Sequence, residues 1–135
     1  MRKFLIALCF SLFGHVAVAA DPAATDGLQA FRGPMEEIVG EAGKGEQQVD
    51  FDAVAKSYAE LGKAWKQVLS EPLDLGRYGV PADKQDEVWR QVRLLGMLVG
   101  YLDEAIQRGN YPLILRTAEM LKPAYANLMA SLGLH

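Results

Sequence analysis

The sequence predicts an all-α protein, an antiparallel four-helix bundle with up-down-up-down topology, from three observations. Apolar residues recur at steps of three and four in four separate stretches, which is the spacing of a buried face on a helix. No stretch has the pattern of a convincing strand. Two of the three connections are short, and short connections favour antiparallel neighbouring helices.

The first two helices are predicted over residues 25–43 and 51–69. The apolar stripe of the first is Leu28, Phe31, Met35, Ile38 and Ala42. The stripe of the second is Val54, Tyr58, Leu61, Trp65 and Val68. Gly43 and Gly45 end the first helix because glycine is a poor helix residue. Asp50 has the side chain and the position of an N-cap for the second helix.

The third helix is predicted over residues 84–108, after a long connection at residues 70–82 that contains two prolines and two glycines. Connections of this length are uncommon unless they pack against the fold or serve a function. Asp83 is the expected N-cap and Gly109 the expected C-terminal cap. The inward stripe is Val88, Val92, Leu95, Val99, Leu102 and Ile106.

The fourth helix is predicted over residues 111–132, with Asn110 as its N-cap and Pro112 in its first turn. Its stripe is Ile114, Ala118, Leu121, Tyr125, Leu128 and Leu132. Pro123 lies inside this range, where it removes one backbone hydrogen bond and crowds the carbonyl of Glu119. We therefore expect this helix to be kinked or locally broken.

The first 20 residues have the pattern of a cleaved secretory signal peptide: two cations, an apolar core and small residues ending in two alanines. The apolar core, residues 4–13, is too short to span a membrane, which requires about 20 residues. The predicted mature protein is residues 21–135, one four-helix domain without a membrane anchor.

The composition of the mature chain excludes several functions. Its 12 Lys and Arg stand against 17 Asp and Glu, a net charge of −5, which disfavours a nucleic-acid partner. The single cysteine, Cys9, belongs to the signal peptide, and the only mature histidine is the terminal His135. Disulfides, covalent haem attachment through CxxCH and histidine catalysis are therefore not expected. Since there is also no Glu-x-x-His motif, we expect no enzyme.

Motifs in both halves of the chain resemble one family of periplasmic bundles. The first half resembles the cytochrome c-prime family, through Arg32, Met35, Ile38, the Lys44-Gly45-Glu46 turn, Asp50 and Asp52. The second half resembles cytochrome b562, through Leu98-Val99-Gly100, Asp103-Glu104-Ala105-Ile106, Ala118-Glu119 and Leu121-Lys122. The motifs follow one another in the family's order and together cover nearly all of residues 28–132.

The resemblance implies a periplasmic four-helix bundle that holds haem between its helices and exchanges electrons with a redox partner. The family's axial methionine falls on Met35 and its axial histidine on Met129. Its CxxCH box falls on residues 125–129, which begin with Tyr125 and contain no cysteine. Arg32 is placed to reach a haem propionate. Many c-prime relatives dimerise, so the resemblance also raises a homodimer.

Three hypotheses follow for these residues. In the first, haem b is bound with Met35 and Met129 as axial ligands, or with Met35 alone, and the protein transfers electrons. In the second, the methionines form a Cu(I) site, because thioethers select that ion. In the third, no cofactor is bound and the bundle is a structural or binding module, since methionine at helical spacing usually serves packing.

Overall fold

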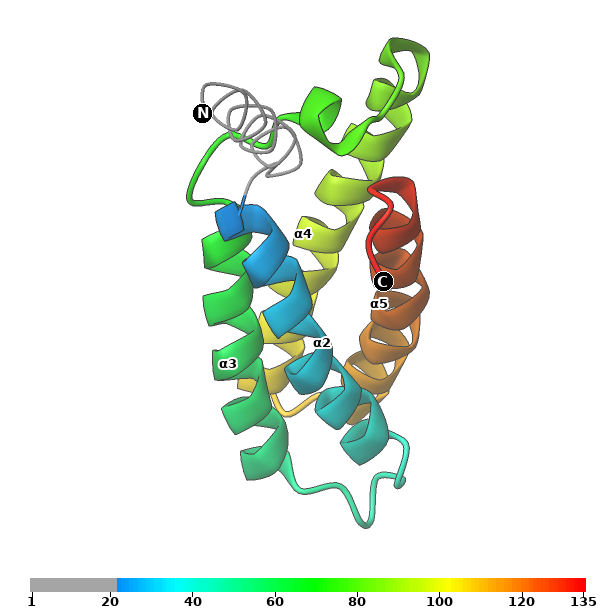
Figure 1. The fold of residues 1–135 in the computed structure, drawn as a ribbon. Helices are drawn as coiled ribbons and strands as arrows, with labels where there is room; N and C mark the ends of the chain where they lie inside the picture. The colour runs from blue at the N-terminus through cyan, green and yellow to red at the C-terminus, as the bar shows by residue number, and fades with distance from the viewer. Residues whose placement is uncertain (1–21) are drawn as a thin grey trace, which may run out of the picture.

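The computed structural model describes residues 22–135 and is all-helical over that range (Figure 1). Its four α-helices are α2 (Pro22–Ala42), α3 (Phe51–Val68), α4 (Gln85–Gln107) and α5 (Tyr111–Ser131). Two 3-10 turns, η1 (Leu75–Tyr78) and η2 (Ala82–Lys84), lie between α3 and α4. The described range contains no strand, so the predicted all-α class with four helices is confirmed.

The predicted signal peptide, residues 1–20, lies outside the described residues. Within residues 22–135, no helix combines the length and the apolar character needed to cross a membrane.

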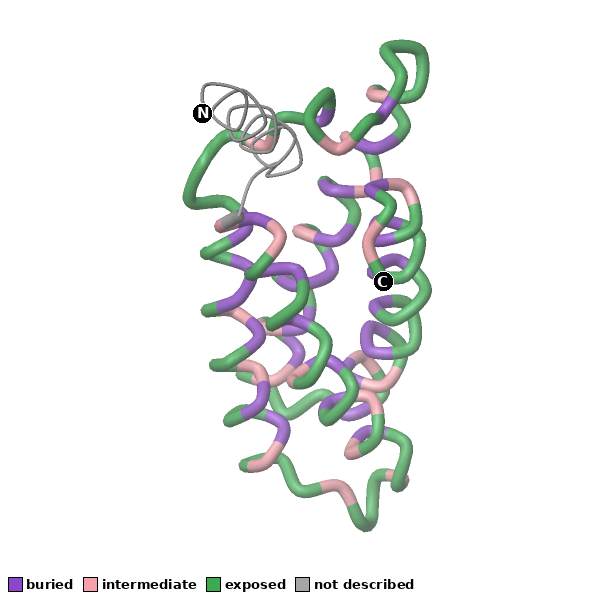
Figure 2. Tube along the Cα trace, in the orientation of Figure 1, coloured by how far each residue is buried: buried purple, intermediate pink, exposed green. Residues whose placement is uncertain are grey.

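The four predicted stripes form one shared core (Figure 2). Every stripe residue of α2 and α5 is buried. In α3 and α4 the stripes are also buried, except for the half-buried Tyr58 and Ile106. Periodicity alone therefore identified the faces on which the bundle is built.

Each helix packs against two neighbours, and α2 and α4 are not among the packed pairs. Helix α2 lies between α3 and α5, while α4 completes the bundle by packing on α3 and α5. Between α3 and α4, the hydroxyl of Tyr58 donates a hydrogen bond of 2.9 Å to the carbonyl of Val99.

Two buried tyrosines join α5 to α2. The Tyr125 hydroxyl donates to the Leu28 carbonyl at 2.5 Å, and the Tyr111 hydroxyl donates to the Ala42 carbonyl at 2.6 Å. The two donors are 14 residues apart on α5, and the two acceptors are equally far apart on α2. The later tyrosine of α5 bonds the earlier carbonyl of α2, and the earlier tyrosine bonds the later carbonyl. Both bonds are therefore consistent with a single alignment of the two helices.

The expected helix caps are mostly confirmed. Asp50 accepts hydrogen bonds from the backbone N–H groups of Asp52 and Ala53, and Asn110 accepts one from Leu113. Gly109 follows α4 with a positive φ of 62°, the left-handed conformation that glycine adopts without strain.

The N-cap assigned to Asp83 is wrong. Asp83 lies within η2, and Lys84 occupies the cap position of α4 without a side-chain hydrogen bond. The chain turns through η2 and continues directly into α4. The turn is stabilised by the backbone hydrogen bond from the Lys84 N–H to the Pro81 carbonyl.

We expected a kink or a local break at Pro123, and no break is present, because α5 is helical without interruption from Tyr111 to Ser131. Helix α2 likewise continues through Pro34. Pro123 and Glu119, whose carbonyl loses its helical donor, are both exposed, so water can hydrogen-bond that carbonyl. The burial of Ala124 and Tyr125 holds the following turn against the core.

Helices α2 and α3 approach each other closely at Gly27. A Cβ atom at this position would lie 2.8 Å from the backbone nitrogen of Val68 and 2.9 Å from the carbonyl oxygen of Ala64. These are backbone atoms, so the contact can be relieved only by moving a helix. The missing side chain of Gly27 therefore sets the distance between α2 and α3.

We predict that Gly27→Ala lowers the free energy of unfolding by about 1–3 kcal/mol, because overpacking exceeds the gain in helix propensity. The matched control is Gly62→Ala in α3, where an added Cβ meets nothing within 4 Å. It should raise stability by about 0.5–1 kcal/mol. Urea denaturation of both variants measures the difference, and equal effects would contradict the proposed close contact.

Candidate functional site

The residues predicted to hold a cofactor lie at the interface of α2 and α5. Met35, Met129 and Tyr125 are all buried, with 2%, 3% and 2% of their surface exposed. Arg32 lies at the edge, with its guanidinium carbon 5.7 Å from the centroid of the Tyr125 ring. The structure thus brings Arg32 and Tyr125 together in a cation–π contact.

The register of α2 and α5 separates the two methionines. Tyr125 reaches Leu28, so Met129, one turn later on α5, lies near the level of Ala24 on α2. Met35 is eleven residues beyond Ala24. At 1.5 Å per residue, the Cα atoms of Met35 and Met129 are about 16 Å apart along the helix axes.

An aromatic cluster fills the space between these two levels. The rings of Phe31 and Tyr125 are stacked, with centroids 5.3 Å apart and an angle of 12° between their planes. Trp65 of α3 meets Phe31 edge-on, with centroids 6.0 Å apart. Phe31 follows Ala24 and precedes Met35 on α2, so the stack lies between the two methionines. This cluster is the packed centre of the interface.

In this packing Met35 and Met129 are not arranged as the axial pair of one haem iron. Metal–sulfur bonds of about 2.3 Å would bring the two sulfur atoms to within about 5 Å of each other. Both side chains lean toward the N-terminus of their own helix, which shortens the separation, but the Phe31–Tyr125 stack still intervenes. Ligation of one haem iron by both sulfurs would require this stack to move.

The other two methionines among residues 22–135 lie on the surface and not beside Met35 or Met129. Met97 and Met120 are 52% and 48% exposed, on the outer sides of α4 and α5. A Cu(I) site of three converging thioethers is therefore not assembled by residues 22–135. Over the same residues, no group of three or more His, Cys, Asp or Glu side chains is placed to hold a metal ion.

The Tyr125 hydroxyl is held in its protonated form. Burial raises the pKa of Tyr125, and the positive charge of Arg32 opposes this increase only in part. The protonated hydroxyl is the form that donates to the Leu28 carbonyl. The hydroxyl thus serves helix packing.

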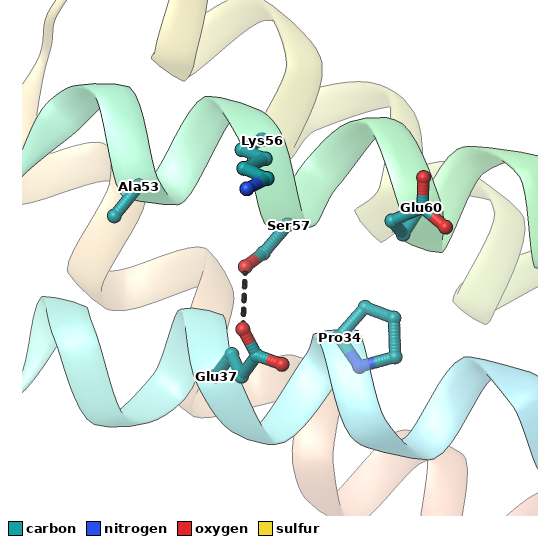
Figure 3. A pocket seen from close by; sticks show the side chains of 6 residues that line it. All are labelled: Pro34, Glu37, Ala53, Lys56, Ser57 and Glu60. Atoms are coloured by element: carbon teal, nitrogen blue, oxygen red, sulfur yellow. Dashed lines mark hydrogen bonds between the residues drawn. The ribbon is translucent and has the colours of Figure 1, made fainter.

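A hollow of about 450 Å³ lies on the surface between α2 and α3 (Figure 3). At its base the Ser57 hydroxyl donates a hydrogen bond of 3.1 Å to the Glu37 carboxylate. This pair was not predicted from the sequence, although Ser57 lies three residues after Val54 and four before Leu61 on the same buried face. The bond links α2 to α3.

An apolar groove of about 340 Å³ lies where the 70–82 connection meets α4. Its walls include Val68, Leu69, Pro72, Leu73, Trp89 and Val92. The connection itself is packed on the bundle, because Leu75 and Val80 are buried and the Tyr78 hydroxyl lies 2.8 Å from that of Thr25. The long connection is therefore an ordered part of the fold that shapes a surface groove.

Comparisons with protein-family models, with curated proteins and with solved structures found no match to this chain.

We predict that Tyr125→Phe lowers the free energy of unfolding by about 1 kcal/mol, the net value of one hydrogen bond. The loss is moderate because the ring stack remains and the Leu28 carbonyl keeps its donor within α2. Phe31→Ala, which removes the stack, should cost about 3–5 kcal/mol. Thermal or urea unfolding measures both, and a Tyr125→Phe protein as unstable as Phe31→Ala would show that the hydroxyl dominates.

We predict that Tyr58 makes the protein lose stability between pH 10 and 12. Burial, assisted by the nearby negative charge of Asp103, raises the pKa of Tyr58 from 10 to about 12. Its contribution is complete below the unfolded-state pKa and disappears as the pH rises through the folded-state pKa. The difference in melting temperature between the wild type and Tyr58→Phe should therefore narrow over this range, and a constant difference would contradict the assignment.

Proposed function

We propose that the protein is a cofactor-free, non-enzymatic binding module of the periplasm, a four-helix protein whose sequence motifs resemble those of the cytochrome b562 and c-prime bundles. The observation that carries this proposal is the stack of Phe31 on Tyr125 between Met35 and Met129. A buried haem would need this volume, and emptying it would cost several kcal/mol of packing free energy. The two methionines then act as core residues.

The proposed topology is antiparallel, up-down-up-down. On the α2–α3 side, Gly27 lies against Val68 while Glu37 bonds Ser57, so the start of one helix meets the end of the other. Between α2 and α5, the two tyrosine bonds likewise join the start of one helix to the end of the other. Both sets of contacts support helices that alternate in direction.

We assign the binding role to the groove beside the 70–82 connection. Its apolar walls and a volume near the small end of ligand sites match one apolar side chain or a small apolar molecule. Trp89 contributes an aromatic ring to the lining from α4, and Leu73 contributes an apolar side chain from the connection. A groove of this kind lies outside the core and leaves the aromatic cluster intact.

A haem titration of the mature chain, residues 21–135, tests the proposal. We expect no Soret band that depends on Met35 or Met129, and no haem-induced rise in melting temperature. A specific site at a hundredfold excess of ligand over its dissociation constant would instead stabilise the fold by about 2.7 kcal/mol. The same titration with Cu(I) should show no binding that exceeds the binding of a Met35→Leu variant.

Two controls separate specific from adventitious haem. Met35→Ala and Met129→Ala should leave any residual haem absorbance unchanged, since haem adsorbed on the surface does not depend on buried sulfur. A Soret band that disappears in Met35→Ala, together with haem-dependent thermal stabilisation of the wild type, would overturn the proposal. It would favour the haem-binding hypothesis in its place.

A further inference from the structure

The outward face of α4 carries three large apolar side chains that the bundle does not cover. Leu94, Met97 and Tyr101 are 41%, 52% and 50% exposed. Their spacing of three and four residues aligns them along one side of the helix, away from its buried residues. Exposed apolar side chains grouped in this way mark an interaction surface.

Charged residues extend this stripe in both directions from Met97. At 100° per residue, Asp86, Arg90, Glu104 and Arg108 all fall within about 20° of a line through Met97 along the helix. Arg90 and Glu104 each lie seven residues from Met97, and Asp86 and Arg108 each lie eleven. Each pair of equidistant residues therefore combines a basic and an acidic side chain: Arg90 with Glu104, and Arg108 with Asp86.

We propose that α4 packs antiparallel against α4 of a second copy, around a two-fold axis that passes beside Met97. Arg90 then faces Glu104 of the partner subunit, and Asp86 faces the partner's Arg108. Leu94 packs beside the partner's Tyr101, and the two Met97 side chains meet at the axis. Because the axis is two-fold, every one of these contacts between different residues occurs twice.

The four charges at seven and eleven residues from Met97 favour a second copy of this chain as the partner. A sequence that becomes charge-complementary when its direction is reversed matches itself, and this symmetry is not required for binding another protein. Arg90 and Arg108 now pair with Glu87 and Glu104 of their own helix, at 2.7 and 2.9 Å. Such exposed pairs are weak, so they can be shared with a partner. Gly100, where an added Cβ meets nothing within 4 Å, leaves one flank open to close approach.

The size of the surface predicts a weak dimer. Helix α4 has 23 residues and is therefore about 34 Å long. A contact made by one helix face lies below the roughly 1,600 Å² of a standard interface. We therefore expect dissociation in the micromolar range and a mass that increases with concentration. This inference does not depend on whether haem binds, because the α4 face lies outside the core.

Sedimentation equilibrium of the mature chain between about 1 and 200 µM tests the interface. The wild type should dimerise, and Met97→Glu should raise the dissociation constant at least tenfold by placing two carboxylates beside the axis. The matched control is Ala30→Glu, which adds the same charge to an exposed position of α2, the helix not packed on α4. Its dissociation constant should remain within threefold of the wild type.

Charge reversal tests the register. Arg90→Glu and Glu104→Arg should each weaken the dimer about tenfold, because each variant places like charges opposite one another twice. Combining both substitutions restores opposite charges, so the double variant should return to within threefold of the wild type. Far-UV circular dichroism confirms that each variant is folded. A wild type that is monomeric at 200 µM, an unaffected Met97→Glu dimer or an unrestored double variant would overturn the proposal.

Discussion

The register between α2 and α5, held by two buried tyrosine hydroxyls, is the constraint on which the rest of the structure depends. Tyr125 and Tyr111 bond the carbonyls of Leu28 and Ala42, at opposite ends of one interface. Sliding α5 by one turn would leave both hydroxyls without these acceptors, and a buried hydroxyl without a partner costs about 1–3 kcal/mol. The two bonds therefore select one alignment from several that apolar packing alone would accept.

That alignment determines what occupies the centre of the bundle. It brings Tyr125 over Phe31 and within reach of Arg32, and it moves Met129 toward the start of α2. Meanwhile Gly27 draws α3 close enough for Trp65 to meet Phe31 edge-on. The aromatic cluster is thus a consequence of one register and one close helix approach, acting on three helices.

Local sequence patterns predicted the helices well, because burial and capping depend on residues a few positions apart. Asp50 and Asn110 cap helices since each reaches a backbone N–H two or three residues away. The failures needed information from farther along the chain or from the solvent side. Helix α5 continues through Pro123 because the carbonyl that loses its donor is exposed to water. Asp83 does not cap α4 because it lies within η2, which leads directly into that helix.

The periodicity of apolar residues could not predict how α2 and α5 are aligned along their axes, and the candidate site depends on that alignment. Met35 was predicted correctly on the buried stripe of its helix. A stripe, however, does not specify how it aligns with the stripe of a second helix. The outer face of α4 was missed for a related reason. Its pattern around Met97 has meaning only once the buried face of α4 is known, because the remaining charges and apolar residues can then be recognised as one line.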